Sequence, residues 1–213
     1  MQSGLLRIIV VAMIALVGVV ALLPRTTVPP PEAATEWPQP RPLPLVEFRN
    51  AAGMTFSTAD LRERFSLVFF GFTNCPDICP TSMAVLAQAM QQLGDSSTPL
   101  PRVVLISVDP ARDDPAALRA YLDRFDETFQ GLTTNEAALA PLLDALGVHV
   151  MKQSLGNELY TVTHNPQVFV VSPAADVIAT LSSATDPAGV ARDYRRIRAR
   201  FLSGATSNAA PPQ

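Results

Sequence analysis

The chain has 213 residues, a formal net charge of −3 and a sequence pI near 5.3. Only 16% of its residues are charged and 7% are aromatic. This acidic balance gives no electrostatic reason to expect a nucleic acid as a partner.

Residues 1–23 are predicted to be an N-terminal transmembrane anchor. Residues 8–23 (IIVVAMIALVGVVALL) carry no charge. Extending the stretch back to Leu5 adds a single charged residue, Arg7. Crossing a bilayer takes about 20 apolar residues, so the segment is just long enough. A cleaved signal peptide is the alternative, although no clear small-x-small site follows directly. Flanking positive charges nearly balance, but a short N-terminal flank before one span favours a domain outside the cytoplasm. The sequence shows no Arg/Ser-rich transit segment, which favours a bacterial inner membrane with the domain on the periplasmic side.

Three further regions follow the predicted anchor. Residues 24–44 hold eight prolines, which predicts a semi-rigid proline-rich linker. Residues 45–203, about 160 residues, are enough for one domain with a full core. Residues 204–213 (GATSNAAPPQ) are predicted to be a disordered tail.

Strand and helix patterns alternate through the predicted domain. Strands are expected at 45–48, 54–56, 66–72, 103–108, 160–164, 167–171 and 177–181. Helices are expected at 58–65, from about Pro80, from about Pro115, between Asn135 and Gly147, and after Asp186. This alternation predicts an α/β domain with helices on both sides of a central sheet, and the small fold that it fits best is thioredoxin-like. The five arginines between Arg192 and Arg200 suggest a solvated helix face, or alternatively a docking patch for an acidic partner.

The only two cysteines, Cys75 and Cys79, lie in GFTNCPDICPT, directly after the apolar strand at 66–72. Ligands bind at the carboxyl ends of strands in open α/β sheets, and a helix N-terminus favours a thiolate. If both cysteines lie on one helical turn, their sulfurs share a face. A structural disulfide would close a very small loop and stabilise little. A redox pair would resemble the Cys-x-x-Cys site of thioredoxins with one residue more, and a thiol peroxidase is also open.

A metal site is the third interpretation, and it needs another ligand. His164 ends a predicted strand just before Asn165 and Pro166, where the sheet could present it to the cysteine loop. His149, which lies between valines, is expected to be structural. Two thiolates and one imidazole select copper(I) and can hold copper(II), whereas structural zinc sites usually have a fourth protein ligand.

The segments GFTNCPDICPTSM, LISVDPARDDPAALRAYLDRF and YTVTHNPQVFVVSP resemble the SCO/SenC family over about residues 44–201. The resemblance implies a membrane-anchored copper chaperone with a thioredoxin-like domain, which helps to assemble the dinuclear copper centre of cytochrome c oxidase. It also implies that Cys75, Cys79 and His164 bind a copper ion, as Cu(I) or Cu(II).

Two departures from the family pattern stand out. Thr163 occupies the position of a common aspartate, and residues 173–176 replace a common Pro-Asp/Glu-Gly turn. If that aspartate orients the imidazole, its absence predicts weaker copper binding.

We therefore predict a chaperone that delivers copper to the dinuclear copper site of cytochrome c oxidase, or matures that site. Its expected partners are the copper-accepting subunit of the oxidase, a copper donor and a thiol reductant. The alternative is a thiol-disulfide oxidoreductase in which Cys75 and Cys79 are the redox-active pair and reduce the cysteines of the copper-accepting partner. The sequence leaves open whether the protein is an enzyme.

Overall fold

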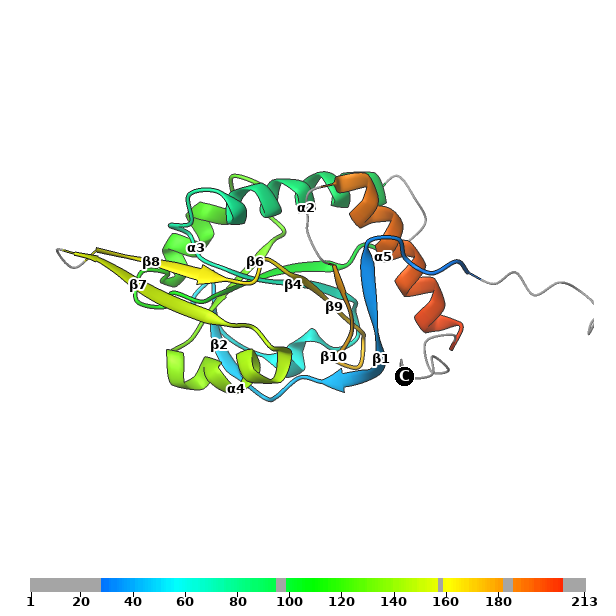
Figure 1. Cartoon of the computed structure of the whole chain (residues 1–213), viewed down its shortest axis with the longest axis horizontal. Coiled ribbons are helices and arrows are strands. Elements are labelled where there is room, and N and C mark those ends of the chain that lie inside the picture. The colour runs from blue at the N-terminus through cyan, green and yellow to red at the C-terminus, as the bar shows by residue number, and fades with distance from the viewer. Residues whose placement is uncertain (1–27, 95–98, 157–158, 182–185, 205–213) are drawn as a thin grey trace, which may run out of the picture.

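The computed structural model describes residues 28–94, 99–156, 159–181 and 186–204, which form an α/β domain (Figure 1). The predicted anchor at residues 1–23 and nearly all of the predicted tail lie outside these described residues. Among the residues that are described, no helix is both long enough and apolar enough to cross a membrane.

A mixed sheet of eight strands forms the centre of the domain, in the order β1-β10-β9-β4-β5-β6-β2-β3. Strands β4, β5 and β6 are parallel, and the other neighbouring pairs are antiparallel. A separate two-stranded sheet contains β7 and β8. The strands are β1 (Ala34–Pro42), β2 (Glu47–Asn50), β3 (Thr55–Ser57), β4 (Ser66–Gly71), β5 (Arg102–Ser107), β6 (Gln130–Thr133), β7 (Val150–Gly156), β8 (Leu159–His164), β9 (Val168–Val171) and β10 (Asp176–Leu181).

Helices cover both faces of the large sheet, as the sequence predicted. Figure 1 shows α2 above the sheet, α4 below it, and α5 running from near α2 down the right-hand side beside β1. The elements are the 3-10 helix η1 (Thr58–Leu61) and the α-helices α2 (Ile78–Gly94), α3 (Pro115–Leu122), α4 (Glu136–Leu146) and α5 (Pro187–Leu202). The expected caps are present: the side chains of Asn135 and Asp186 accept hydrogen bonds from backbone N–H groups in the first turns of α4 and α5. Gly147 ends α4 with a left-handed φ of 65°.

Strand β4 lies at the middle of the core. All of its residues are buried, because β5 and β9 pair with its two edges and helices cover its faces. The apolar run SLVFFGF therefore has the environment that its composition predicts.

Besides β1, two strands, β6 and β7, were not expected from the sequence. Strand β6 has the sequence QGLT, which is short and shows no apolar alternation. It forms because β5 offers a parallel edge, and because Gly131 leaves room for α3: a Cβ on Gly131 would lie 2.9 Å from the Cβ of Leu118. Strand β7 pairs antiparallel with β8, and its own sequence has no local pattern that predicts a strand.

The proline-rich segment differs most from expectation. Residues 24–44 were predicted to be a linker, but Ala34–Pro42 form β1, an edge strand antiparallel to β10. Pairing is interrupted between Glu36 and Arg41, where Pro38 and Pro40 cannot donate to a ladder. An edge position tolerates such prolines, so the folded domain includes much of this segment.

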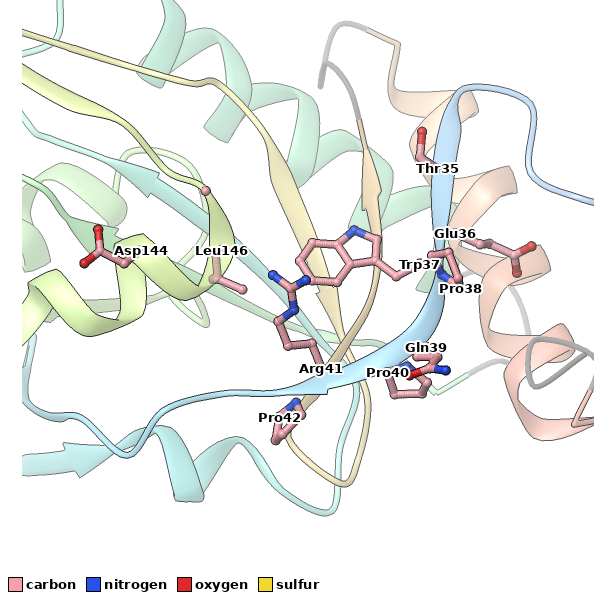
Figure 2. A pocket seen from close by; sticks show the side chains of 11 residues that line it. Thr35, Glu36, Trp37, Pro38, Gln39, Pro40, Arg41, Pro42, Asp144 and Leu146 are labelled. Atoms are coloured by element: carbon pink, nitrogen blue, oxygen red, sulfur yellow. The ribbon is translucent and has the colours of Figure 1, made fainter. Parts of the chain in front are cut away.

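Side chains also attach β1 to the domain. Trp37 donates from its indole N–H to the hydroxyl of Thr180 at 2.7 Å and packs edge-on against Phe169. Arg41 stacks on the Trp37 ring at 4.8 Å and donates to the carbonyl of Ala145 at 2.7 Å. Figure 2 shows these two side chains reaching from β1 toward the end of α4, across an open pocket of about 860 Å³. Neither cysteine lines this pocket, and nor does His164.

A fully buried carboxylate on α5 holds the start of the N-terminal segment. Asp193 is 0% exposed and accepts hydrogen bonds from the backbone N–H groups of residues 32, 33 and 34, at 2.7–3.1 Å. Around it, Arg192 and Arg196 pair with Glu32, and Arg200 pairs with Glu36. Three of the five arginines thus contact the chain's own N-terminal segment, rather than only solvent or a partner.

Replacing Asp193 with alanine should lower the free energy of unfolding by about 2–3 kcal/mol, because three backbone donors lose a charged acceptor. Urea denaturation followed by circular dichroism measures the change. Asp123→Ala is the matched control: its exposed ion pair with Arg119 should be worth less than about 0.5 kcal/mol. Equal losses in the two variants would contradict the role given to Asp193.

Candidate metal centre

The two cysteines lie where β4 leads into α2, but they do not share a helical turn. Cys79 is in the first turn of α2, whereas Cys75 lies in the preceding loop, where its N–H donates to the carbonyl of Phe72 at 3.3 Å. The two sulfurs therefore do not share a helix face, an arrangement that the sequence left open. Pro76 follows Cys75, and a residue that precedes proline is disfavoured in the helical conformation. Both cysteines are free thiols.

Cys79 is fully buried at the carboxyl end of β4, with an exposed fraction of 0%. Its sulfur lies close to the backbone of Gly71: a Cβ there would be 3.1 Å from Cys79 Sγ and 2.7 Å from Phe69. Glycine at this position therefore lets α2 approach the strand closely enough to bury the sulfur. The Cys75 side chain is near enough to contribute to the raised pKa of the Cys79 thiol.

His164 completes the group from a distant part of the chain. It is the last residue of β8, and its Nε2 lies 3.5 Å from Cys79 Sγ, across 85 positions of sequence. The rings of Phe69 and Phe72 meet the imidazole edge-on, with centroids 5.8 Å and 6.1 Å away. The structure thus brings together the three residues that the sequence analysis selected, and the aromatic packing fixes the position of the imidazole.

Hydrogen bonding indicates which nitrogen of His164 carries the proton. Nδ1 lies 3.1 Å from the carbonyl oxygen of Asn165, which can only accept. The proton of a neutral imidazole is therefore on Nδ1, and the lone pair of Nε2 faces Cys79.

Burial keeps the thiol and the imidazole uncharged. Desolvation raises the pKa of the Cys79 thiol, and this outweighs the hydrogen bond from the backbone of Phe72, which lowers it. Desolvation also lowers the pKa of His164, against a smaller opposite effect of its bond to Asn165. Both shifts favour a neutral thiol that donates to a neutral imidazole.

Asp113 holds the start of the cysteine loop. It is fully buried and accepts hydrogen bonds from the backbone N–H and hydroxyl of Thr73, at 3.1 Å and 2.6 Å, and from the hydroxyl of Ser107 at 2.6 Å. The sequence analysis did not connect Asp113 with the loop. The motif DPARDD after β5 contained it, but only the parallel pairing of β4 and β5 places it beside Thr73.

The described residues contain no group of three or more His, Cys, Asp or Glu side chains that already stands in a metal-binding arrangement. The closest approach to one is the pair Cys79 and His164 with Cys75 beside it. His149 is exposed, and its backbone N–H donates to the side chain of Asn165. The three grouped residues offer two sulfurs and one nitrogen, a soft set that suits copper(I) once the thiols lose their protons.

Comparison with known proteins gives this site its context. The SCO1/SenC family matches residues 46–199 of the chain. A protein of Stutzerimonas stutzeri whose name describes it as copper-binding is 37% identical over 136 residues, covering 64% of this chain and 67% of that protein. An SCO2-like protein of Rickettsia conorii is 38% identical over 102 residues, covering 48% of this chain and 49% of that protein.

Solved structures agree with the sequence matches. ScoI of Arabidopsis thaliana with copper bound has a TM-score of 0.69 at 25% identity, covering 74% of this chain and 98% of that one. Copper-bound ScoI of Bradyrhizobium japonicum has a TM-score of 0.66 at 26% identity, covering 73% of this chain and 99% of that one. The predicted thioredoxin-like α/β fold is thereby confirmed. With the family match over residues 46–199, these findings show that the chain belongs to the SCO1/SenC family.

Proposed function

We propose that this protein is a copper chaperone that binds one copper ion through Cys75, Cys79 and His164 and passes it to the dinuclear copper site of cytochrome c oxidase. The observation that carries the proposal is the contact of Cys79 Sγ with His164 Nε2 at 3.5 Å, with the Cys75 thiol adjacent. The copper-bound structures of two relatives support the choice of metal.

Loading would replace protons with copper. In the free protein the Cys79 thiol faces the lone pair of His164 Nε2, so the space between them is where a soft cation would take the place of a hydrogen bond. Two thiolates then supply two negative charges to the ion, and the imidazole supplies a neutral third donor. Cys75, which is only half-buried, is the ligand that an acceptor's thiolates would reach first.

The imidazole of His164 has an orienting group even though the residue before it is Thr163. Thr163 is exposed, and neighbouring residues of a strand point to opposite faces, so it lies away from the site. Nδ1 of the imidazole instead donates a hydrogen bond to the carbonyl of Asn165. A backbone acceptor therefore does the work that the sequence analysis assigned to a missing aspartate.

The redox state of the cysteine pair would control loading. Copper needs two free sulfurs, so a disulfide between Cys75 and Cys79 would block binding until a thiol reductant restored them. The alternative function, a thiol-disulfide oxidoreductase acting on the copper-accepting partner, uses the same pair without the metal.

The cellular location is proposed from the sequence of residues 1–23. We propose that residues 1–23 anchor the protein in a bacterial inner membrane, that the domain faces the periplasm, and that the copper-accepting subunit of the oxidase and a copper donor meet it there.

Anaerobic titration of the reduced full-length protein in detergent with Cu(I), against a chromophoric chelator, tests the proposal. We expect one tight equivalent, and a loss of affinity of at least about 100-fold in His164→Ala, since losing a group that only orients a ligand already costs about 10–100-fold. His149→Ala removes the other histidine and should change nothing. An unchanged affinity in His164→Ala would remove this residue from the site. Absent copper binding together with dithiol reductase turnover would favour the oxidoreductase.

The two thiols should also differ in reactivity without any metal. Because Cys79 is buried and its pKa is raised, its thiolate fraction is small near neutral pH, and its alkylation by iodoacetamide should lag behind that of Cys75. Below the pKa of a thiol, each unit of pH raises its thiolate fraction about tenfold, so alkylation of Cys79 should accelerate steeply as pH rises. Mass spectrometry of the labelled peptides measures both rates, with the urea-unfolded chain as the control. Equal rates in the folded protein would contradict this account of the site.

A further inference from the structure

The position of His164 depends on a hairpin that stands apart from the main sheet. Strands β7 and β8 pair with each other, and Figure 1 shows them projecting beyond the helices, with the end of β8 at the body of the domain. His164 is the last residue of β8. Because the hairpin forms its own two-stranded sheet, side chains must fix its orientation on the domain.

One face of β8 points toward the domain. Tyr160, Val162 and His164 alternate with Thr161 and Thr163 along the strand, so these three side chains share a face. Val162 is 6% exposed and His164 is half-buried, whereas Thr163 is exposed, which identifies the inward face. Tyr160 lies about 13 Å from His164 along the strand, at about 3.3 Å per residue. A contact at Tyr160 therefore restricts the direction in which the strand carries the imidazole.

Tyr160 is held by two residues of the loop after β5. Its hydroxyl donates to Asp109 Oδ1 at 2.6 Å. The guanidinium of Arg112 lies 4.0 Å from the centre of the Tyr160 ring, donates to the Tyr160 carbonyl at 3.3 Å, and forms an ion pair with Asp109. We call these three residues, Asp109, Arg112 and Tyr160, the Tyr160 latch.

Asp109, a member of the latch, lies next to the strand end that positions Cys79. Asp109 is 0% exposed, and its backbone follows Val108, whose N–H donates to the carbonyl of Gly71 at 2.9 Å. Gly71 is the residue against which Cys79 packs. The latch thus connects the strand that carries His164 to the strand end that positions the sulfur.

Another polar contact of the hairpin is weaker. Lys152 forms an ion pair with Glu136, but 35% and 64% of these side chains are exposed, and exposed pairs contribute little. The hydroxyl of Tyr160 instead donates to a buried carboxylate, which gives a short, charge-assisted hydrogen bond. The hairpin's orientation therefore depends more on the latch than on the exposed pair.

We propose that Asp109 and Arg112 are positioning residues for His164, which act through Tyr160 to keep the imidazole facing Cys79. This inference rests on the proposed function, because it assigns the latch a share of the copper affinity that His164 supplies. The Tyr160 hydroxyl donates to Asp109 and not to the cysteines or the imidazole, so its loss should weaken the contribution of His164.

Tyr160→Phe removes the latch hydroxyl and keeps the ring that packs under Arg112. In reduced full-length protein in detergent, we expect Cu(I) affinity to fall about 10-fold in the otherwise unchanged chain. The same substitution made in His164→Ala should cause no further loss, because two residues that act through one interaction are not additive. Tyr194→Phe is the matched control: its hydroxyl donates to the carbonyl of Pro99 at 3.3 Å and contacts neither the cysteines nor His164, so affinity should not change.

A second measurement needs no copper. The chain has two histidines, so ¹³C-histidine labelling gives two imidazole signals. His164 lies beside two aromatic rings, and ring currents make its signal sensitive to small displacements, whereas His149 is exposed. Tyr160→Phe should shift the His164 signal, and Tyr194→Phe should leave it in place.

The outcomes separate the two proposals. An unmoved His164 signal in Tyr160→Phe, or equal losses of affinity with and without His164, would overturn the latch. If His164→Ala leaves affinity unchanged while the His164 signal moves in Tyr160→Phe, the latch positions the imidazole but the proposed metal site fails.

Discussion

Burial of a thiol and an imidazole against the end of β4 is the constraint on which the rest of the structure depends. Cys79 can lie there only because Gly71 has no side chain, and His164 is held there by two phenylalanine rings. Removal from water keeps both groups neutral, so the pair is stable without metal and yet consists of soft donors. The buried strand, the start of α2 and the separate hairpin all meet at this point.

Much of this arrangement could be predicted from local sequence. The run SLVFFGF predicted a buried strand, and Asn135 and Asp186 predicted helix starts, because each of these signals acts within a few residues. The cysteines were evident from their rarity, and His164 from its place at a strand end. The sequence left open whether Cys75 and Cys79 share a helical turn, and the structure places Cys75 in the loop before α2.

Features that depend on distant contacts were not predictable. Strand β1 has a composition that suits a spacer, and it is held by pairing with β10 and by contacts with α5. Asp113 and Tyr160 look like ordinary loop and strand residues until the parallel pairing of β4 and β5 and the hairpin register bring their partners to them. Asp193, in an arginine-rich helix, gave no sign that its carboxylate would bind backbone N–H groups 159 to 161 positions away.

The attachment of the N-terminal segment to α5 has a consequence for how copper could be handed over. Arg200 donates to the carbonyl of Val28, so only positions 24–27 separate the first held residue from the proposed anchor. Four residues reach about 14 Å at most when fully extended. A spacer of 21 free residues would let the copper site sweep widely above the membrane; so short a tether would not. Delivery would then be a search in two dimensions, in which the acceptor must diffuse in the bilayer to a domain that stays close to the membrane surface.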